Sequence, residues 1–317
     1  MKIKEIYEKA YSRGMDVDPR GTGEVKAELE RAKKDFDGLK DNEKERFDKE
    51  RLQNPYADTR ILYGDPGKEV KRVMVGIDIE VGEVLLADRI GERSKPVDLI
   101  IAHHPEGRAM ANLYAVMDMQ AGILMKYGVP INVAEDIMEE RIREVERRIM
   151  PVNHMRAVDA ARLLDIPLIC VHTPADNSVA GFLQKLFDDK KPSYVSDIMD
   201  ILDGVPEYKD ASREVLSPKV VSGSARRRAG RVFVDMTGGT GGSKKAFSSL
   251  SNAGVGTVVG MHISEDHRKE AEKHHVNVVI AGHVSSDSIG MNLILDNVLS
   301  PEVEVVEASG FRRVVRT

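Results

Sequence analysis

The chain has 317 residues, of which 41% are apolar and 31% charged, a composition typical of a globular protein with one large domain or two modest ones. Its 47 basic and 52 acidic residues give a net charge of −5, and it has no tryptophan, which argues against a nucleic-acid-binding protein. The single cysteine, Cys170, excludes an internal disulfide framework and a cysteine-cluster metal site.

No apolar run approaches the ~20 residues that a membrane-spanning helix needs. The N-terminal sequence MKIKEIYEKA also lacks a hydrophobic signal region. We therefore expect a cytoplasmic protein without a membrane span.

Residues 1–52 are dense in charge and are predicted to form a helical extension. Between Val25 and Leu39, apolar residues recur every three or four positions among Lys, Glu, Asp and Arg. This spacing predicts one apolar stripe on a long, solvated helix. The extension is expected to pack on the body of the protein or on a neighbouring subunit.

Residues 53–215 are predicted to form a first α/β lobe. Short apolar runs bounded by turn residues indicate strands, and longer amphipathic runs indicate helices. The expected strands are 61–64, 71–79, 98–102, 130–134 and 167–171, and the expected helices are 81–90, 112–126, 137–150, 151–164 and 178–187.

Residues 216–317 are predicted to form a second lobe that carries a glycine loop. Residues 204–230 are interpreted as a connector, with a basic surface cluster at 226–228. The expected strands are 231–235, 257–260, 277–281 and 303–306, and the expected helices are 243–252, 264–274 and 286–299. This alternation predicts an α/β fold of two lobes with mainly parallel or mixed sheets.

Histidine and aspartate follow three of the predicted strands. His103 and His104 come directly after strand 98–102, Asp176 follows strand 167–171, and His283 and Asp287 follow strand 277–281. Chemistry in open α/β sheets lies at the carboxyl ends of strands, so we expect these five side chains to converge. The four-residue spacing of His283 and Asp287 puts both on one helical face.

Imidazole and carboxylate groups are suitable ligands for Zn, Mn, Fe or Co, and the pattern does not select one of them. Five such groups suffice for two divalent ions with a bridging carboxylate. The alternative is that each histidine is a satisfied polar residue and that Asp176 and Asp287 are helix N-caps.

The segments DLIIAHHP, CVHTPAD and GHVSSD together resemble the Nif-three-like family, also called the DUF-thirty-four family or GTP cyclohydrolase type-two homologues. Asp58 in YADTRILYG and VGID around Asp78 are similar to further family segments. The resemblance covers roughly residues 54–300. Asp287 stands where the family usually has Glu, one methylene longer.

The resemblance implies a dinuclear metal site between two α/β lobes, in a ring-shaped homo-oligomer that is commonly a hexamer. Matched position by position, the ligands are His103, His104, Asp176, His283 and Asp287. His172 also matches a family position, and its expected role is to orient Asp176 rather than to bind metal.

His262, Glu265 and His267 lie near the family's third segment and are catalytic candidates that bind substrate or move protons, with a surface role as the alternative. The loop 238–242 can hold a phosphate on its backbone N–H groups, and a tight turn explains it equally well.

The sequence and its resemblance therefore predict a dinuclear metal-dependent hydrolase that acts on a nucleotide or another phosphate-bearing small molecule. The alternative is a non-catalytic metal-binding regulatory or scaffold protein.

Overall fold

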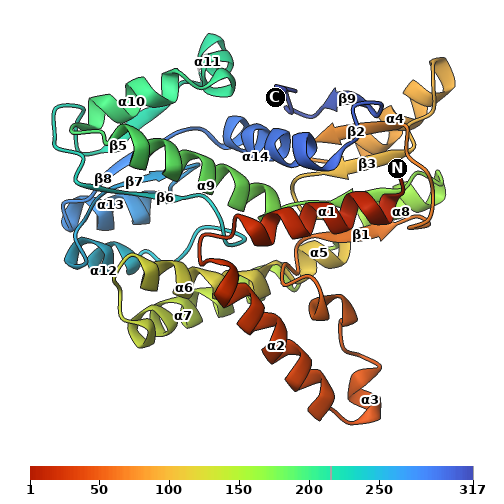
Figure 1. The fold of residues 1–317 in the computed structure, drawn as a ribbon, viewed down its shortest axis with the longest axis horizontal. Coiled ribbons are helices and arrows are strands. Elements are labelled where there is room, and N and C mark those ends of the chain that lie inside the picture. Colours follow the sequence, from red (N-terminus) through yellow and green to blue (C-terminus); the bar gives the residue numbers. More distant parts are fainter. Residues whose placement is uncertain (215, 317) are drawn as a thin grey trace.

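The computed structural model describes residues 1–214 and 216–316, which form two β-sheets with helices around and between them (Figure 1). The first sheet has the order β1-β4-β3-β2-β9, and the second has the order β5-β8-β7-β6. Strands β1 and β5 are antiparallel to their neighbours, and the other neighbouring strands are parallel. The predicted α/β class with mixed sheets is confirmed.

The strands are short apolar runs, as the sequence predicts. Each residue of β3 is buried, because helices cover both faces of this sheet. The strand bounds are β1 Arg60–Tyr63, β2 Arg72–Gly76, β3 Leu99–Ala102, β4 Leu168–Cys170, β5 Lys219–Ser222, β6 Arg231–Asp235, β7 Val255–Gly260, β8 Asn277–Ile280 and β9 Glu304–Ala308.

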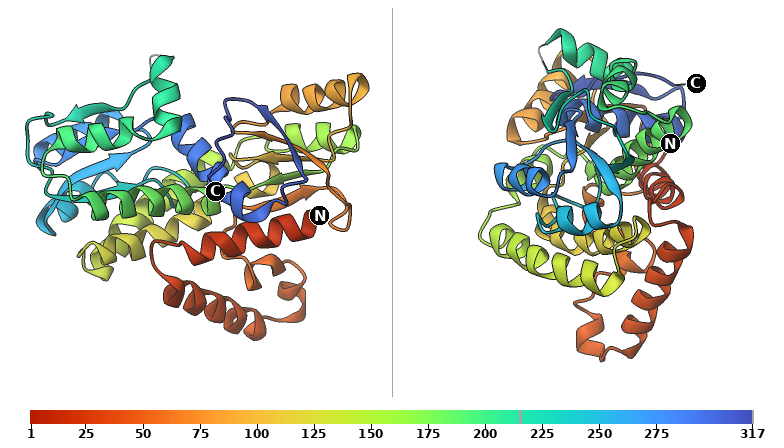
Figure 2. Two further views of the ribbon diagram at one scale, coloured as in Figure 1. Left: turned by 45° about the horizontal axis from the view of Figure 1, so that its top comes forward. Right: turned by 90° about the vertical axis from the view of Figure 1, so that its left-hand side faces the viewer.

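The helices lie around and between the sheets, and two of them, α9 and α14, connect one sheet to the other (Figure 2). Their bounds are α1 Ile3–Asp16, α2 Thr22–Gly38, α3 Asp41–Lys44, α4 Val81–Arg93, α5 Gly107–Ala111, α6 Met119–Lys126, α7 Ile131–Ile149, α8 Arg156–Leu163, α9 Thr173–Lys190, α10 Val195–Asp203, α11 Pro206–Arg213, α12 Ala246–Asn252, α13 Glu265–Lys273 and α14 His283–Val298. Short 3-10 helices are η1 Lys49–Leu52 and η2 Leu113–Asp118.

The N-terminal extension is part of the body and not only an appendage. Ile3, Ile6 and Ala10 of α1 are buried in the core of the first sheet, against α9 and α14. The predicted solvated helix is α2, which projects from the body together with α3 (Figure 1).

Three local predictions are wrong. Residues 130–134, predicted as a strand, open helix α7, because Pro130 takes the position before the first helical turn, where its missing N–H costs nothing. The predicted connector 204–230 contains helix α11 and strand β5. The predicted helix 112–126 is α-helical only from Met119, because residues 113–118 form the 3-10 helix η2.

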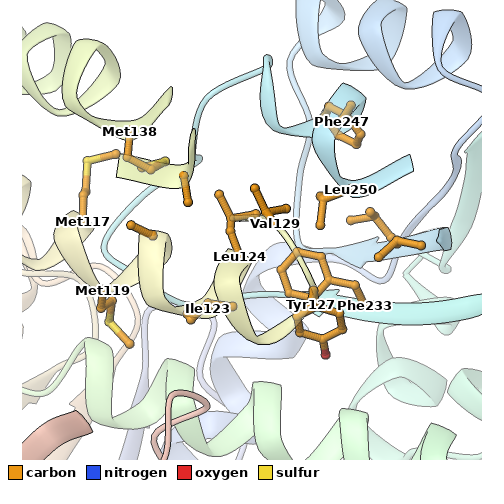
Figure 3. Packing of buried hydrophobic residues seen from close by; sticks show 14 of the residues in the cluster. Met117, Met119, Ile123, Leu124, Tyr127, Val129, Met138, Phe233, Phe247 and Leu250 are labelled. Carbon is orange, nitrogen blue, oxygen red and sulfur yellow. The ribbon is translucent and has the colours of Figure 1, made fainter. Parts of the chain in front are cut away.

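The packing crosses the predicted lobe boundary at 215/216 in both directions. Strand β9, expected to close the second lobe, pairs in parallel with β2 of the first sheet. Helices α6 and α7, expected in the first lobe, pack on the second sheet, where Leu124 and Tyr127 meet Phe233 and Leu250 (Figure 3). Each sheet therefore pairs or packs with elements from both predicted lobes.

None of the helices in the described part of the chain combines the length and apolar character that crossing a membrane requires.

Candidate metal centre

Three segments that follow strand ends meet between the two sheets. His103 and His104 follow β3, His172 lies between β4 and α9, and α14 follows β8. Helix α9 leaves the first sheet and α14 returns to it, so the two helices pack against each other between the sheets (Figure 1). This arrangement brings together all five side chains that the sequence predicts as ligands.

The first group of potential ligands is His103, Asp176 and Asp287, all of them buried. The Nε2 atom of His103 lies 3.5 Å from Oδ1 of Asp176 and 3.4 Å from Oδ1 of Asp287. These atoms come from three different elements and point at one another.

The second group is His104, His283 and Asp287. The Oδ2 atom of Asp287 lies 3.6 Å from Nε2 of His104 and 3.7 Å from Nε2 of His283. His283 and Asp287 share one face of α14, as their spacing predicts.

Asp287 presents one carboxylate oxygen to each group. Within the described residues, neither of these oxygens has a hydrogen-bond partner, and the same holds for Nε2 of His103 and Oδ1 of Asp176. A buried polar atom without a partner costs about 1–3 kcal/mol, and more when it is charged. A cation between these atoms would satisfy them, so the donor set is suited to metal ions of the kind that His and Asp bind.

Three histidine rings are held with Nε2 directed at the cluster. The Nδ1 atom of His103 lies 3.3 Å from the Val171 carbonyl oxygen, and Nδ1 of His104 lies 2.6 Å from Oδ1 of Asp78. Nδ1 of His172 lies 2.8 Å from Oδ2 of Asp58. When Nδ1 donates to an oxygen, the lone pair of the neutral ring is on Nε2, which is the usual arrangement of a metal-binding histidine.

The two buried carboxylates have opposite pKa shifts. Burial raises the pKa of Asp176 well above its usual range, an effect that His103 opposes and Asp287 reinforces. Burial acts in the same direction on Asp287, but His103 and the other nearby histidines hold its pKa below the usual value. Burial, together with His103 and His172, lowers the pKa of His104 to about 4, so this ring is neutral at pH 7.

Comparison with known proteins finds a solved structure that is similar to this chain in both fold and sequence. No family model and no curated protein matches the chain. The solved structure of a NIF3 superfamily protein from Sphaerobacter thermophilus has a TM-score of 0.71 and 29% sequence identity to it, covering 80% of this chain and 92% of that one.

The chain is similar to NIF3 superfamily proteins in fold and in sequence.

Two more distant solved structures also match the chain. HcgD from Methanocaldococcus jannaschii has a TM-score of 0.47 and 17% identity, over 78% of the NIF3-like chain and 87% of its own. A Bacillus cereus protein related to NIF3 has a TM-score of 0.44 and 11% identity, over 79% and 89%.

The structure does not place Asp176 or Asp287 at an N-cap, which was the alternative explanation for both. The cap of α9 is His172 and the cap of α14 is Gly282, so both carboxylates lie inside helices. Their side chains face the cluster and not the backbone N–H groups of the first turn.

Of the three catalytic candidates, only His262 lies beside the cluster. Its ring centroid is 5.0 Å from that of His283, and burial lowers its pKa. Glu265 is instead paired with Arg268 on the surface of α13. His267 contacts Ser264 Oγ through Nδ1 and the Gly242 carbonyl oxygen through Nε2.

The glycine loop of the NIF3-like chain is anchored through its carbonyl groups. Gln120 donates from Nε2 to the carbonyl oxygens of Gly238 and Thr240, at 2.6 and 2.7 Å. Arg141 donates to that of Gly241 at 3.0 Å. The next helix, α12, begins only at Ala246, so the loop does not open directly onto a helix N-terminus. These contacts favour the tight-turn interpretation.

Sequence reasoning missed how closely His172 approaches the cluster. Its Nε2 atom lies 3.7 Å from Oδ2 of Asp176, and His172 forms a third potential ligand group with His103 and His104. The signal was the His172–Asp176 spacing of four, the same as in His283–Asp287. The partner that orients His172, Asp58, is 114 residues away in sequence.

A cavity of about 960 Å³ adjoins the cluster on the side of the second sheet. His262 and His283 line it, together with the cations Lys219 and Arg312. No ion pair of either cation is found among the described residues, and the same holds for Glu214 at this cavity. The other acidic residues that line it, Glu207 and Asp210, are paired with arginines. Met261, Ile263, Ile280 and Val284 add apolar surface.

Proposed function

We propose that this NIF3-like protein is a dinuclear metal-dependent hydrolase. The observation that carries the proposal is the position of Asp287, whose two unpartnered oxygens face separate ligand groups. One ion would be held by His103, Asp176 and Asp287, and the other by His104, His283 and Asp287. Two-metal sites in hydrolases commonly use such a shared carboxylate.

Two divalent ions at this position would generate a nucleophile from water at neutral pH and act as Lewis acids toward a phosphoryl or carbonyl oxygen. The protein's own contribution is to hold the ligands and to exclude solvent. His103, Asp176 and Asp287 are all buried, and the carbonyl of Val171 and the carboxylate of Asp78 fix the rings of His103 and His104.

We propose that the adjoining cavity binds a small anionic substrate, such as a nucleotide or another phosphate ester. Lys219 and Arg312 supply positive charge, and the apolar residues supply surface for a ring or chain. We propose that His262 exchanges a proton with a bound substrate, and its position in the lining of this cavity next to His283 supports this role.

The test is metal content and turnover of the wild-type protein and of His103→Ala. Purified protein is expected to bind about two divalent ions per chain and to hydrolyse at least one compound in a panel of nucleotides and phosphate esters with added Mn²⁺ or Zn²⁺. His103→Ala is expected to lose both properties. Turnover retained by His103→Ala would refute the assignment.

A second candidate is a non-catalytic metal-binding regulatory or scaffold protein. This candidate is favoured because Glu265 and His267 make contacts away from the cluster. Of the three catalytic candidates, His262 alone then lies beside the cluster. Metal binding without turnover of any compound in the same panel would favour this candidate.

We also propose that the protein forms a homo-oligomer. Its resemblance to the Nif-three-like family implies a hexamer. Because α1 belongs to the core, a test of the projecting segment should remove only residues 22–47. Light scattering of the full chain and of this deletion would show whether an oligomer exists and whether α2 contributes to it.

A further inference from the structure

One arginine outside the cluster of candidate ligands is almost completely buried. Arg60, at the start of β1, is 1% exposed. Its Nη1 atom donates to the carbonyl oxygens of Tyr56 and Thr59, at 2.5 and 2.7 Å, and its Nη2 atom lies 2.7 Å from Oδ2 of Asp48. Arg60 therefore ties the segment 56–60 to η1 and its cap in the N-terminal extension.

Tyr7 of the extension and Asn54, which follows it, hold the same segment. The Thr59 carbonyl oxygen also accepts hydrogen bonds from Tyr7 Oη and Asn54 Nδ2, at 3.2 and 2.9 Å. Asn54 in turn accepts a hydrogen bond from the backbone N–H of Tyr56 at 2.9 Å. The backbone on both sides of residue 58 is thus fixed by side chains from residues 7 and 54 together with Arg60.

The fixed segment carries the groups that orient His172. Asp58 is fully buried, and its Oδ2 atom lies 2.8 Å from Nδ1 of His172 and accepts a hydrogen bond from Thr173 Oγ1 at 2.6 Å. The Thr59 hydroxyl accepts a hydrogen bond from the backbone N–H of His172 at 3.1 Å. Ring and backbone of His172 are therefore both held by residues 58 and 59.

A second chain of contacts runs from the extension to Asp176. Tyr56 donates from its hydroxyl group to Oδ2 of Asp18 at 2.9 Å, and Asn177 donates to the Tyr56 hydroxyl at 3.2 Å. Asn177 also donates to the Gly14 carbonyl oxygen at 3.2 Å. Asn177 directly follows Asp176 in α9, so this contact fixes the turn that carries the carboxylate.

We propose that residues 1–54 are a positioning element for the metal centre and that Arg60 and Asn54 transmit its effect through Asp58 to His172. The proposal rests on the proposed metal binding. His172 acts on the centre through Asp176, whose Oδ2 atom lies 3.7 Å from its Nε2 atom. Residues that hold the groups around a metal site in place are typically worth 10–100-fold in metal affinity. Arg60 and Asn54 are positioning residues, because they contact neither the cluster nor its cavity.

The first experiment compares Zn²⁺ affinity, by competition with a chromophoric chelator, in wild type, Arg60→Met, Asn54→Ala and the control Arg72→Met. Arg72 is also largely buried and paired with a carboxylate, Glu304 at 3.0 Å, but it lies at the start of β2, at the opposite end of the sheet from the cluster. Arg60→Met and Asn54→Ala are expected to bind Zn²⁺ about 10–100-fold more weakly than wild type, and Arg72→Met equally tightly. Equal affinity in all four proteins would overturn the proposal.

The second experiment reads the ring of His172 directly. In ¹⁵N spectra of the metal-free proteins, His172 is expected to carry its proton on Nδ1 in wild type and to become a mixture of tautomers in Arg60→Met and Asn54→Ala. His103, whose Nδ1 partner is the Val171 carbonyl, serves as the internal reference and should not change. An unchanged His172 in folded variants would contradict the proposal.

The two experiments separate the possible failures. If wild type binds no Zn²⁺, the proposed metal function fails, and the tautomer of His172 still tests the positioning. If circular dichroism shows that Arg60→Met is unfolded, Asn54→Ala, which retains the buried charge pair, decides the outcome.

Discussion

Gly290 of α14 lies directly against the carbonyl oxygen of Ala175 in α9. A Cβ atom at position 290 would be 2.4 Å from this oxygen, so the two helices meet where there is no room for a side chain. Asp176 follows Ala175, and Asp287 lies one helical turn before Gly290 on α14. The close contact therefore sets the separation of the two buried carboxylates.

Gly290→Ala is expected to force α9 and α14 apart, since the atom in the way belongs to the backbone and cannot rotate aside. Overpacking of this kind typically costs about 1–3 kcal/mol of unfolding free energy. Zn²⁺ affinity should fall as well, because the two carboxylates separate. Urea unfolding of the metal-free protein and chelator competition would measure the two effects.

Gly82→Ala is the matched control, because a Cβ atom at this helical position meets no atom within 4 Å. It should leave the metal affinity unchanged and the stability unchanged or higher by up to about 1 kcal/mol. Identical behaviour of the two variants would show that the contact at Gly290 does not set the geometry of the cluster.

Asp287→Asn is expected to reduce the metal content from about two ions per chain to one or none, because it removes the charge that both ligand groups share. Asp287→Glu, which restores the carboxylate with a longer side chain, should retain about two. Elemental analysis of the purified proteins would measure the content, with the exposed Asp203→Asn as the control. A full complement of metal in Asp287→Asn would rule out a shared carboxylate.

The convergence of the five candidate ligands was predictable because each signal is local. An apolar strand that ends in two histidines, and a histidine and an aspartate one helical turn apart, can be identified within a few residues of sequence. The carboxyl ends of neighbouring parallel strands then place such groups at one edge of a sheet.

What sequence reasoning missed depends on long-range contacts. The orientation of His172 is set by Asp58, 114 residues earlier, and no local pattern reports it. Strand β9 has the pattern of any short strand, and its pairing with β2 follows from the return of α14 to the first sheet. Residues 130–134 show that a short apolar run after Pro can begin a helix as readily as a strand.

The double variant Lys219→Glu/Arg312→Glu is expected to weaken binding of an anionic substrate without loss of metal. Each exposed cation contributes up to about 1 kcal/mol to an ion pair, so the KM for a phosphate ester such as para-nitrophenyl phosphate should rise roughly 5- to 30-fold. The value of kcat and the metal content should stay the same. An unchanged KM would remove the cavity from the proposed substrate site. The double variant Lys33→Glu/Lys209→Glu, at exposed positions on α2 and α11, changes the net charge by the same amount and is the control.

Asp48 is expected to make the stability of the protein depend on pH below about 5. Burial raises the pKa of this carboxyl, but the Arg60 guanidinium outweighs that effect and holds it below its usual value. A carboxyl with a depressed folded-state pKa stabilises the protein above its unfolded pKa of about 3.9, and this contribution is lost as the pH falls through the folded value.

The stability difference between wild type and Asp48→Asn should therefore be constant from pH 7 to about 5 and shrink as the pH approaches 3. Urea midpoints measured across this range, with EDTA present so that metal release does not contribute, would follow it. Asp203→Asn, at an exposed position, is the control. A difference between wild type and Asp48→Asn that is the same at pH 3 and pH 7 would mean that Arg60 does not stabilise the charged form of Asp48.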